Sequence, residues 1–227
     1  LLVQLGALGV SLYQPVVVQE LFASVLRVQA DLVARWMLIG FIHGVMNSDN
    51  MTLSGETIDY GPCAFLDEYD PQRWFSSIDH AGRYRYSAQP AMAMWDLARL
   101  AECLVPLVPG DPDAAVERAQ EIVESFRETY ETERLDLFRA KLGLPTEGVD
   151  ADLVEELLEI TAAEPLDFTG LFRDLARLLR GERATAGGAT VIEGVEDRGR
   201  WDVWVERWLA LVDEGGDRVD TARRMDE

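Results

Sequence analysis

The sequence has little cysteine and almost no lysine, and both shortages narrow what the protein can be. Its two cysteines, Cys63 and Cys103, are too few for a disulfide framework, which favours a reducing compartment such as the cytoplasm. We expect both to be small buried apolar residues rather than redox groups. Lys141 is the single lysine, because 20 of the 21 basic residues are arginine. A reaction that needs a lysine therefore has one candidate.

Positive charge is scarce as well, with 21 basic residues against 41 acidic ones and a net charge of −20. Such a chain repels phosphate backbones and anionic membrane surfaces, so we expect neither nucleic acid nor membrane as a partner. Long apolar runs are missing too. Residues 1–18, the most apolar stretch, contain polar residues and a proline, and form neither a convincing membrane span nor a signal peptide. Because the first residue is leucine, we expect the chain to begin inside a longer protein.

Apolar residues recur at helical spacing through most of the chain, which predicts a mainly α-helical fold with an ample core. Helices are expected at residues 16–36, 91–104, 151–160, 168–180 and 201–212. Residues 112–142 form either one long helix or two nearly collinear ones. A flexible loop is expected at 181–199, where Gly, Ala and Thr are frequent. The tryptophans at 201, 204 and 208 share one helix face and should line a core.

Residues 40–90 break the helical pattern, which predicts loops with one or two short strands. An irregular span of this length inside a compact domain is usually functional. It contains Gly-Phe-Ile-His-Gly-Val-Met-Asn-Ser-Asp-Asn at 40–50 and Thr-Ile-Asp-Tyr-Gly-Pro at 57–62. Mg²⁺ prefers hard oxygen ligands and takes its remaining oxygens from a triphosphate, so an amide oxygen and a carboxylate from such strings suffice to hold it. A carboxylate next to a substrate hydroxyl can also accept its proton.

The two strings resemble the metal-binding loops of kinase-fold enzymes. In those enzymes a loop that begins with His carries a metal-binding Asn seven positions later, as His43 and Asn50 do here. An Asp-Phe-Gly segment adds a carboxylate, and Asp59 opens the corresponding Asp-Tyr-Gly. Kinases place a catalytic Asp two positions after the His, where this chain has Val45. The whole pattern, with further matches in order as far as residue 100, resembles the selenoprotein O family.

This resemblance implies a kinase-like enzyme that binds ATP in a reversed orientation and transfers AMP to protein hydroxyls, with release of pyrophosphate. It implies that Asp49 is the catalytic base and that Asn50 and Asp59 bind Mg²⁺, with Asp59 also contacting the nucleotide. ATP and protein substrates would be the partners. We therefore expect residues 1–227 to form a mainly α kinase-like C-terminal lobe without its N-terminal lobe. A short β-hairpin would carry the metal loops within 40–90, ahead of a helical subdomain at 91–227.

The chain departs from the family in what precedes His43. The family's phosphate-binding lysine, its acidic partner and its glycine-rich loop have no counterpart there, and Lys141 lies in a helical pattern well beyond Asp49. A cysteine that some members carry after the Asp-Tyr-Gly segment is replaced by Phe75. We therefore expect the chain to be inactive by itself and to self-associate through the apolar face that the missing lobe would cover.

Two other functions stay open. The chain could belong to a phosphotransferase of the same fold that moves the γ-phosphate, or it could be a non-catalytic helical binding module. Locally, Asp49 and Asn50 could simply form a turn that caps its own backbone. His43 is expected to brace the loop rather than to act as a base, and a zinc site is not expected from two histidines and two distant cysteines.

Overall fold

The computed structural model describes residues 15–145, 151–164, 166–182 and 191–226, so the expectations for residues 1–14 and 183–190 lie outside it. The fold is mainly helical, as predicted, and includes a two-stranded antiparallel sheet. The helices are α2 (Pro15–Leu38), α3 (Gln89–Leu104), α4 (Pro112–Glu124), α5 (Phe126–Lys141), α6 (Ala151–Ala163), α7 (Phe168–Leu179), α8 (Arg198–Gly215) and α9 (Arg218–Asp226). The strands are β1 (Phe41–Ile42) and β2 (Ala64–Phe65), with Phe41 opposite Phe65 and Ile42 opposite Ala64.

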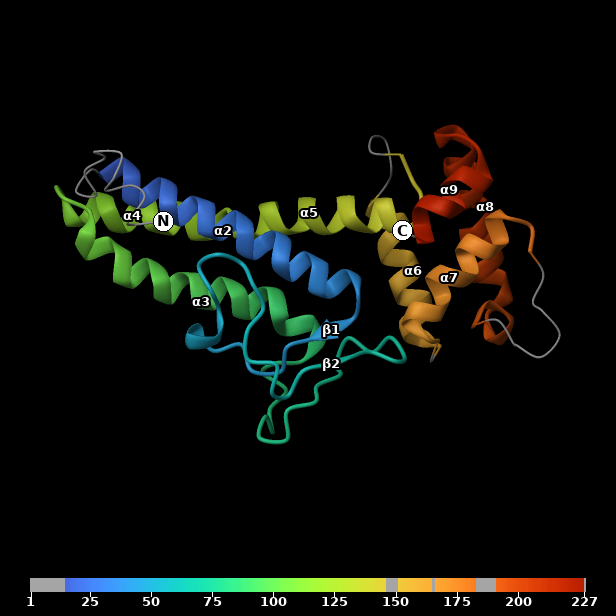
Figure 1. Ribbon diagram of the computed structural model, residues 1–227, viewed down its shortest axis with the longest axis horizontal. Helices are drawn as coiled ribbons and strands as arrows, with labels where there is room; N and C mark the ends of the chain where they lie inside the picture. Colours follow the sequence, from blue (N-terminus) through green and yellow to red (C-terminus); the bar gives the residue numbers. More distant parts are fainter. Residues whose placement is uncertain (1–14, 146–150, 165, 183–190, 227) are drawn as a thin grey trace.

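The helices form two groups that α5 connects (Figure 1). Helices α2, α3 and α4 lie at one end with the hairpin loops beside them, and α6 to α9 lie at the other. Each group has its own core. Phe126 and Tyr130, near the start of α5, belong to the first core, whereas Phe138, near its end, belongs to the second. Because α5 also packs along α2, it fixes the group that carries the hairpin against the C-terminal helices.

The tryptophans of α8 are buried in the second core, as their spacing predicted. Trp201, Trp204 and Trp208 stack in succession, with ring centres 5.5 and 5.7 Å apart. The indole N–H of Trp204 donates to the carbonyl oxygen of Leu153, and that of Trp208 donates to the carbonyl oxygen of Leu142. These bonds satisfy the polar edges of the indoles while their rings bury a large apolar surface. Helix α8 is thereby held to α6 and to the end of α5.

Several expectations need correction. Residues 112–142 form two helices that meet at Ser125, so the second alternative is the right one. Helix α9 was missed because its few buried residues, such as Thr221 and Ala222, form no apolar stripe, and packing against α7 supports it instead. Cys103 is exposed and Cys63 only partly buried, so their predicted burial is wrong. Cys103 lines an open pocket between α2 and α3 rather than the core.

The loop expected at 181–199 is also shorter than predicted. Within its described part, residues 191–194 form a 3₁₀ turn and α8 begins at Arg198. In the described ranges no helix combines the length and the apolar character that crossing a bilayer requires.

Candidate active site

The candidate site lies in the long connection between β1 and β2, which carries Asp49, Asn50 and Asp59. The predicted hairpin is therefore present. An isolated antiparallel bridge between Met51 and Thr57 folds this connection back on itself. Residues that flank such a bridge are neighbours as well, so the chain at Asn50 lies beside the chain that leads into Asp59. Local pairing thus brings two of the predicted residues into one region.

His43 braces this connection from the inside. Its side chain is fully buried, and its ring centre lies 5.3 Å from that of Trp36. Because Nδ1 accepts a hydrogen bond from the Val45 N–H at 3.3 Å, Nε2 carries the hydrogen and donates to the Ile58 carbonyl oxygen at 2.8 Å. Burial lowers the pKa of His43, which keeps the imidazole neutral. The geometry matches the bracing role expected for this residue and holds the chain just before Asp59.

Gln89, the first residue of α3, holds the end of β1 from the other side. Its side chain is fully buried. The side-chain Oε1 of Gln89 accepts a hydrogen bond from the His43 backbone N–H at 2.9 Å. The side-chain Nε2 donates to the Phe41 carbonyl oxygen at 2.9 Å. From α2, the Trp36 indole N–H donates to the Thr57 hydroxyl at 3.0 Å. Hydrogen bonds from both α2 and α3 therefore hold the connection between β1 and β2 in place.

Asn50 is held with the nitrogen of its side-chain amide directed inward. Nδ2 donates to the Val45 carbonyl oxygen at 2.9 Å. This bond fixes the orientation of the amide and leaves Oδ1, an acceptor, as the end that can meet a ligand. An amide oxygen fixed in this way suits one position in a Mg²⁺ coordination shell.

Asp59 has an unusual backbone. Its φ of 55° makes it the only residue other than glycine with a positive φ in the described part of the chain. Aspartate tolerates this left-handed region better than most residues, but the conformation still has to be held by its surroundings. The side chain is exposed, and the charge of its carboxylate acts on the ring of His43. Backbone strain at an exposed polar residue is typical of functional sites.

With this geometry in place, comparison with known proteins is informative. The family model described as "Protein adenylyltransferase SelO" matches residues 12–225. The chain belongs to the SelO family. The resemblance found in the sequence is therefore confirmed, and the match covers the whole connection between β1 and β2.

Curated SelO relatives named "Protein nucleotidyltransferase YdiU" are similar over most of this chain. The protein of Mycobacterium sp. (strain KMS) is 48% identical over 206 residues, which are 88% of this chain and 41% of the relative. That of Rhodococcus jostii (strain RHA1) is 47% identical over 206 residues, or 90% of this chain and 39% of the relative. A Rhizobium etli protein is 49% identical over 189 residues, or 83% of this chain and 37% of the relative. The chain thus spans only part, 37–41%, of these relatives.

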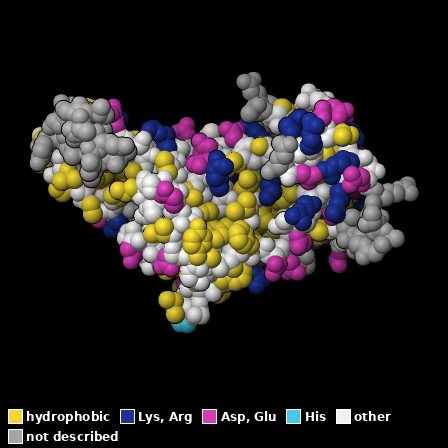
Figure 2. Space-filling model, viewed as in Figure 1, with side chains coloured by type: hydrophobic (Ala, Val, Ile, Leu, Met, Phe, Trp, Pro, Cys, Tyr) yellow, Lys and Arg dark blue, Asp and Glu magenta, His cyan; other side chains and the backbone are white. Residues whose placement is uncertain are grey.

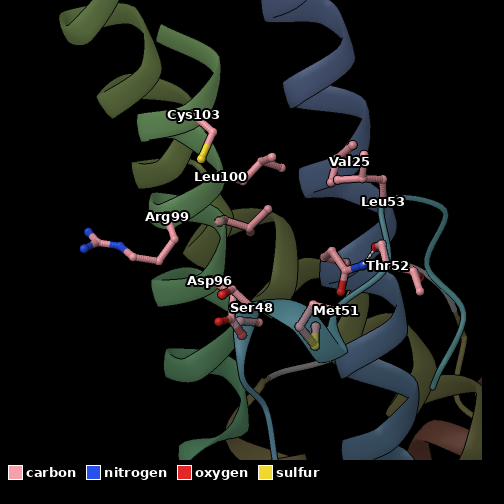
Figure 3. Close-up of a pocket in the computed structure, with 12 residues that line it drawn as sticks. Val25, Ser48, Met51, Thr52, Leu53, Asp96, Arg99, Leu100 and Cys103 are labelled. Carbon is pink, nitrogen blue, oxygen red and sulfur yellow. Dashed lines mark hydrogen bonds between the residues drawn. The ribbon is translucent and has the colours of Figure 1, made fainter. Parts of the chain in front are cut away.

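In this SelO chain Asp96 lies near the predicted base, Asp49, a position that the sequence patterns did not predict. Asp96 of α3 is 6% exposed, and burial raises its pKa to about 7; the nearby charge of Asp49 also raises it, whereas that of Arg83 lowers it. In Figure 3 the side chain of Asp96 lies next to Ser48, at the turn that carries Asp49. The sequence did contain a sign of this position. Asp96 is a charged residue within an apolar helical stripe, since its neighbours Ala93 and Leu97 face the core.

Lys141 has a structural position rather than one near the candidate site. Its Nζ donates to the Leu38 carbonyl oxygen at 2.6 Å, at the end of α2, and lies 4.0 Å from the centre of the Phe172 ring. Burial lowers its pKa to about 8. The side chain is engaged between α2 and α7, in agreement with the expectation that it does not replace the family's phosphate-binding lysine.

The donor set suits Mg²⁺ better than a metal held by protein ligands alone. Among the described residues, no group of three or more His, Cys, Asp and Glu side chains could hold a metal ion. This argues against a preformed zinc site in that part of the chain. The predicted ligands, Asp59 and Asn50, would supply one carboxylate and one amide oxygen. Mg²⁺ commonly takes few protein ligands and completes its shell with phosphate oxygens and water.

Proposed function

We propose that the protein to which this chain belongs is a magnesium-dependent protein adenylyltransferase that transfers AMP from ATP to Ser, Thr or Tyr hydroxyls of proteins. The observation that carries this proposal is the SelO match over residues 12–225, because it includes Asp49, Asn50 and Asp59. The printed name of the relatives, a protein nucleotidyltransferase, agrees with transfer of a nucleotide. The proposed fold is the C-terminal lobe of a kinase-like enzyme, supported by a long helix, a hairpin connection and a second helix in that order.

In this proposal Asn50 and Asp59 hold Mg²⁺, which neutralises charge on the phosphate oxygens when it is bound. Asp49 accepts the proton of the acceptor hydroxyl as the hydroxyl oxygen attacks the α-phosphorus of ATP. The bond from the α-phosphorus to the oxygen bridging it to the β-phosphorus breaks, and pyrophosphate leaves. The contacts of His43 and Gln89 keep the loop in one conformation, so little positioning is needed during the reaction.

We also propose that the chain by itself is inactive. Nucleotidyl transfer depends mainly on positioning and charge neutralisation, and one carboxylate and one amide cannot hold a triphosphate. Tyr60 and Phe65, next to the candidate site, are 62% and 58% exposed. Figure 2 shows apolar side chains gathered over this region of the molecule. Such an exposed apolar patch supports the proposal that this face is covered by another part of the full-length protein or by a second copy of the chain.

A cytoplasmic location belongs to the same proposal, and it is supported by the two cysteines, Cys63 and Cys103, both of which are free.

The decisive experiment measures what the full-length protein transfers. The protein is incubated with ATP, Mg²⁺ and a hydroxyl-bearing acceptor protein, and the mass of the acceptor and the released product are determined. Added AMP with released pyrophosphate is expected. Asp59→Ala should abolish the transfer, whereas Asp202→Ala, which removes an exposed carboxylate from α8, should retain it.

The other outcomes separate the remaining functions. Added phosphate with released ADP would show a phosphotransferase of the same fold. No transfer and no binding of ATP with Mg²⁺ by the full-length protein would favour a helical binding module.

A further inference from the structure

The pocket lined by Cys103 lies beside the candidate active site, in a cavity between α2, α3 and the segment around residues 48–53 (Figure 3). Its volume is about 270 Å³, enough for a side chain or a small molecule of a few heavy atoms. Much of its wall is apolar and is formed by Val25, Leu53, Leu97 and Leu100. Such a wall favours an aliphatic group.

The cavity also contains two buried residues with unpaired acceptor atoms. Among the described residues, both carboxylate oxygens of Asp96 and Oε1 of Gln29 find no hydrogen-bond partner, although these residues are only 6% and 3% exposed. The Nε2 atom of Gln29 donates to the Thr52 carbonyl oxygen, which leaves Oε1 as the unpaired end. Buried acceptors without a partner are rare in native proteins, and each calls for an explanation. A bound ligand that donates hydrogen bonds to these oxygens would explain them.

The charges around the cavity favour a positive ligand. Arg99 lines it, but its side chain points away in Figure 3. The Arg99 guanidinium pairs with Glu102 at 2.8 Å and lies 5.2 Å from the centre of the Trp95 ring. Arg83 and Asp49 both act on Asp96 electrostatically, with opposite signs. Arg83 makes no hydrogen bond to the Asp96 carboxylate, whose oxygens accept none from the part of the chain that the structure describes.

We propose that this cavity binds a cation on an aliphatic stem, an ammonium or guanidinium group. An ammonium group has three N–H donors and no acceptor, which suits the unpaired oxygens of Asp96 and Gln29. The stem packs against the apolar wall. An anion is repelled by Asp96, and a purely apolar ligand leaves the acceptors buried without partners. The same chemistry can come from a free small amine or from a lysine or arginine side chain of a polypeptide.

The test is an NMR titration of the 227-residue chain with isotope-labelled methionine methyl groups. Met51 lines the cavity, whereas Met225 packs near Gly143 in the C-terminal group and serves as an internal reference. The probes are n-butylammonium and its neutral isostere n-butanol. We expect the Met51 methyl resonance to respond to n-butylammonium, with an affinity at least about tenfold higher than for n-butanol, while that of Met225 does not move.

Three variants make the test specific. Asp96→Asn keeps the side-chain shape and should weaken n-butylammonium binding by about tenfold or more, whereas Asp202→Asn, which removes an exposed carboxylate, should change it less than about twofold. Leu100→Phe fills the cavity while retaining Asp96 and should abolish the response, so the test survives if Asp96→Asn does not fold. Equal affinity for n-butanol, or unchanged affinity in Asp96→Asn or Leu100→Phe, would overturn the proposal.

A last titration identifies the source of the cation, using Nα-acetyl-lysine methylamide as a blocked lysine. Tighter binding of this probe than of n-butylammonium assigns the cavity to a polypeptide side chain, and weaker binding assigns it to a free amine.

Discussion

Replacing Gln89 by leucine tests whether α3 holds the candidate active site in place. Leucine is close to glutamine in size, so the main loss is that of two hydrogen bonds, to the His43 N–H and the Phe41 carbonyl oxygen. Because Gln89 is fully buried, water cannot easily take its place. A buried polar group left unpaired costs about 1–3 kcal/mol, so with two such groups we expect the free energy of unfolding to fall by about 2–6 kcal/mol.

Two measurements check this expectation. Urea unfolding followed by far-UV circular dichroism gives the change in the free energy of unfolding, provided that the slope against urea is unchanged. Amide hydrogen exchange at His43 reports the lost bond directly, since its N–H donates to the side chain of Gln89. The matched control is Gln72→Leu, at an exposed position, which should change stability by less than about 0.5 kcal/mol.

A clear result would refute the reasoning. If Gln89→Leu lowered stability no more than Gln72→Leu did, and the His43 amide kept its protection from exchange, then Gln89 would not be what holds the end of β1. In the full-length protein the same substitution should reduce turnover, because the loop that carries Asp49 and Asn50 follows this strand directly.

Three further predictions concern the site and the charge of the only lysine. In the full-length protein, Asp49→Ala should lower turnover about 10²–10⁴-fold and leave ATP affinity by calorimetry nearly unchanged; collapsed affinity with normal turnover would make Asp49 a nucleotide ligand instead. The chain alone, with ATP and Mg²⁺, should release no pyrophosphate, and robust release would contradict the need for a second lobe. For Lys141, the folded pKa of about 8 lies below the ordinary 10.5, so the unfolded state binds more protons between these values and stability should rise with pH across that window. The rise, at most roughly 3 kcal/mol, should be absent from urea titrations of Lys141→Met; equal curves would refute it.

Patterns that are local in the sequence predicted much of the fold and of the candidate site. Helical spacing located α2, α3 and α8, because an apolar stripe both specifies the helix and marks its buried face. The strings around Asn50 and Asp59 predicted a hairpin connection, which the structure contains. These features could be predicted because each depends on residues that are close together in the chain.

What the sequence did not reveal depends on long-range contacts. Gln89 and His43 are 46 positions apart, and helical spacing shows that Gln89 is on α3 but not what its amide meets. Asp96 could be recognised as a charge within an apolar stripe, but not as a neighbour of Asp49. Helix α9 has no apolar stripe and takes its support from α7, which only the packed fold brings against it.

The hydrogen bonds of the 3₁₀ turn Ser48–Asn50 bear on the simplest alternative, a turn that only caps its own backbone. A self-capping turn needs a side-chain oxygen that accepts a nearby backbone N–H. Asn47, at the N-cap position, makes no such bond, and its Oδ1 accepts from the Tyr84 hydroxyl at 2.6 Å instead. Asn50 donates from its side-chain amide to the Val45 carbonyl oxygen, so it does hold backbone of the same connection. Asn47 therefore does not cap this turn, and the side chain of Asp49 lies exposed on it, where a ligand can reach it.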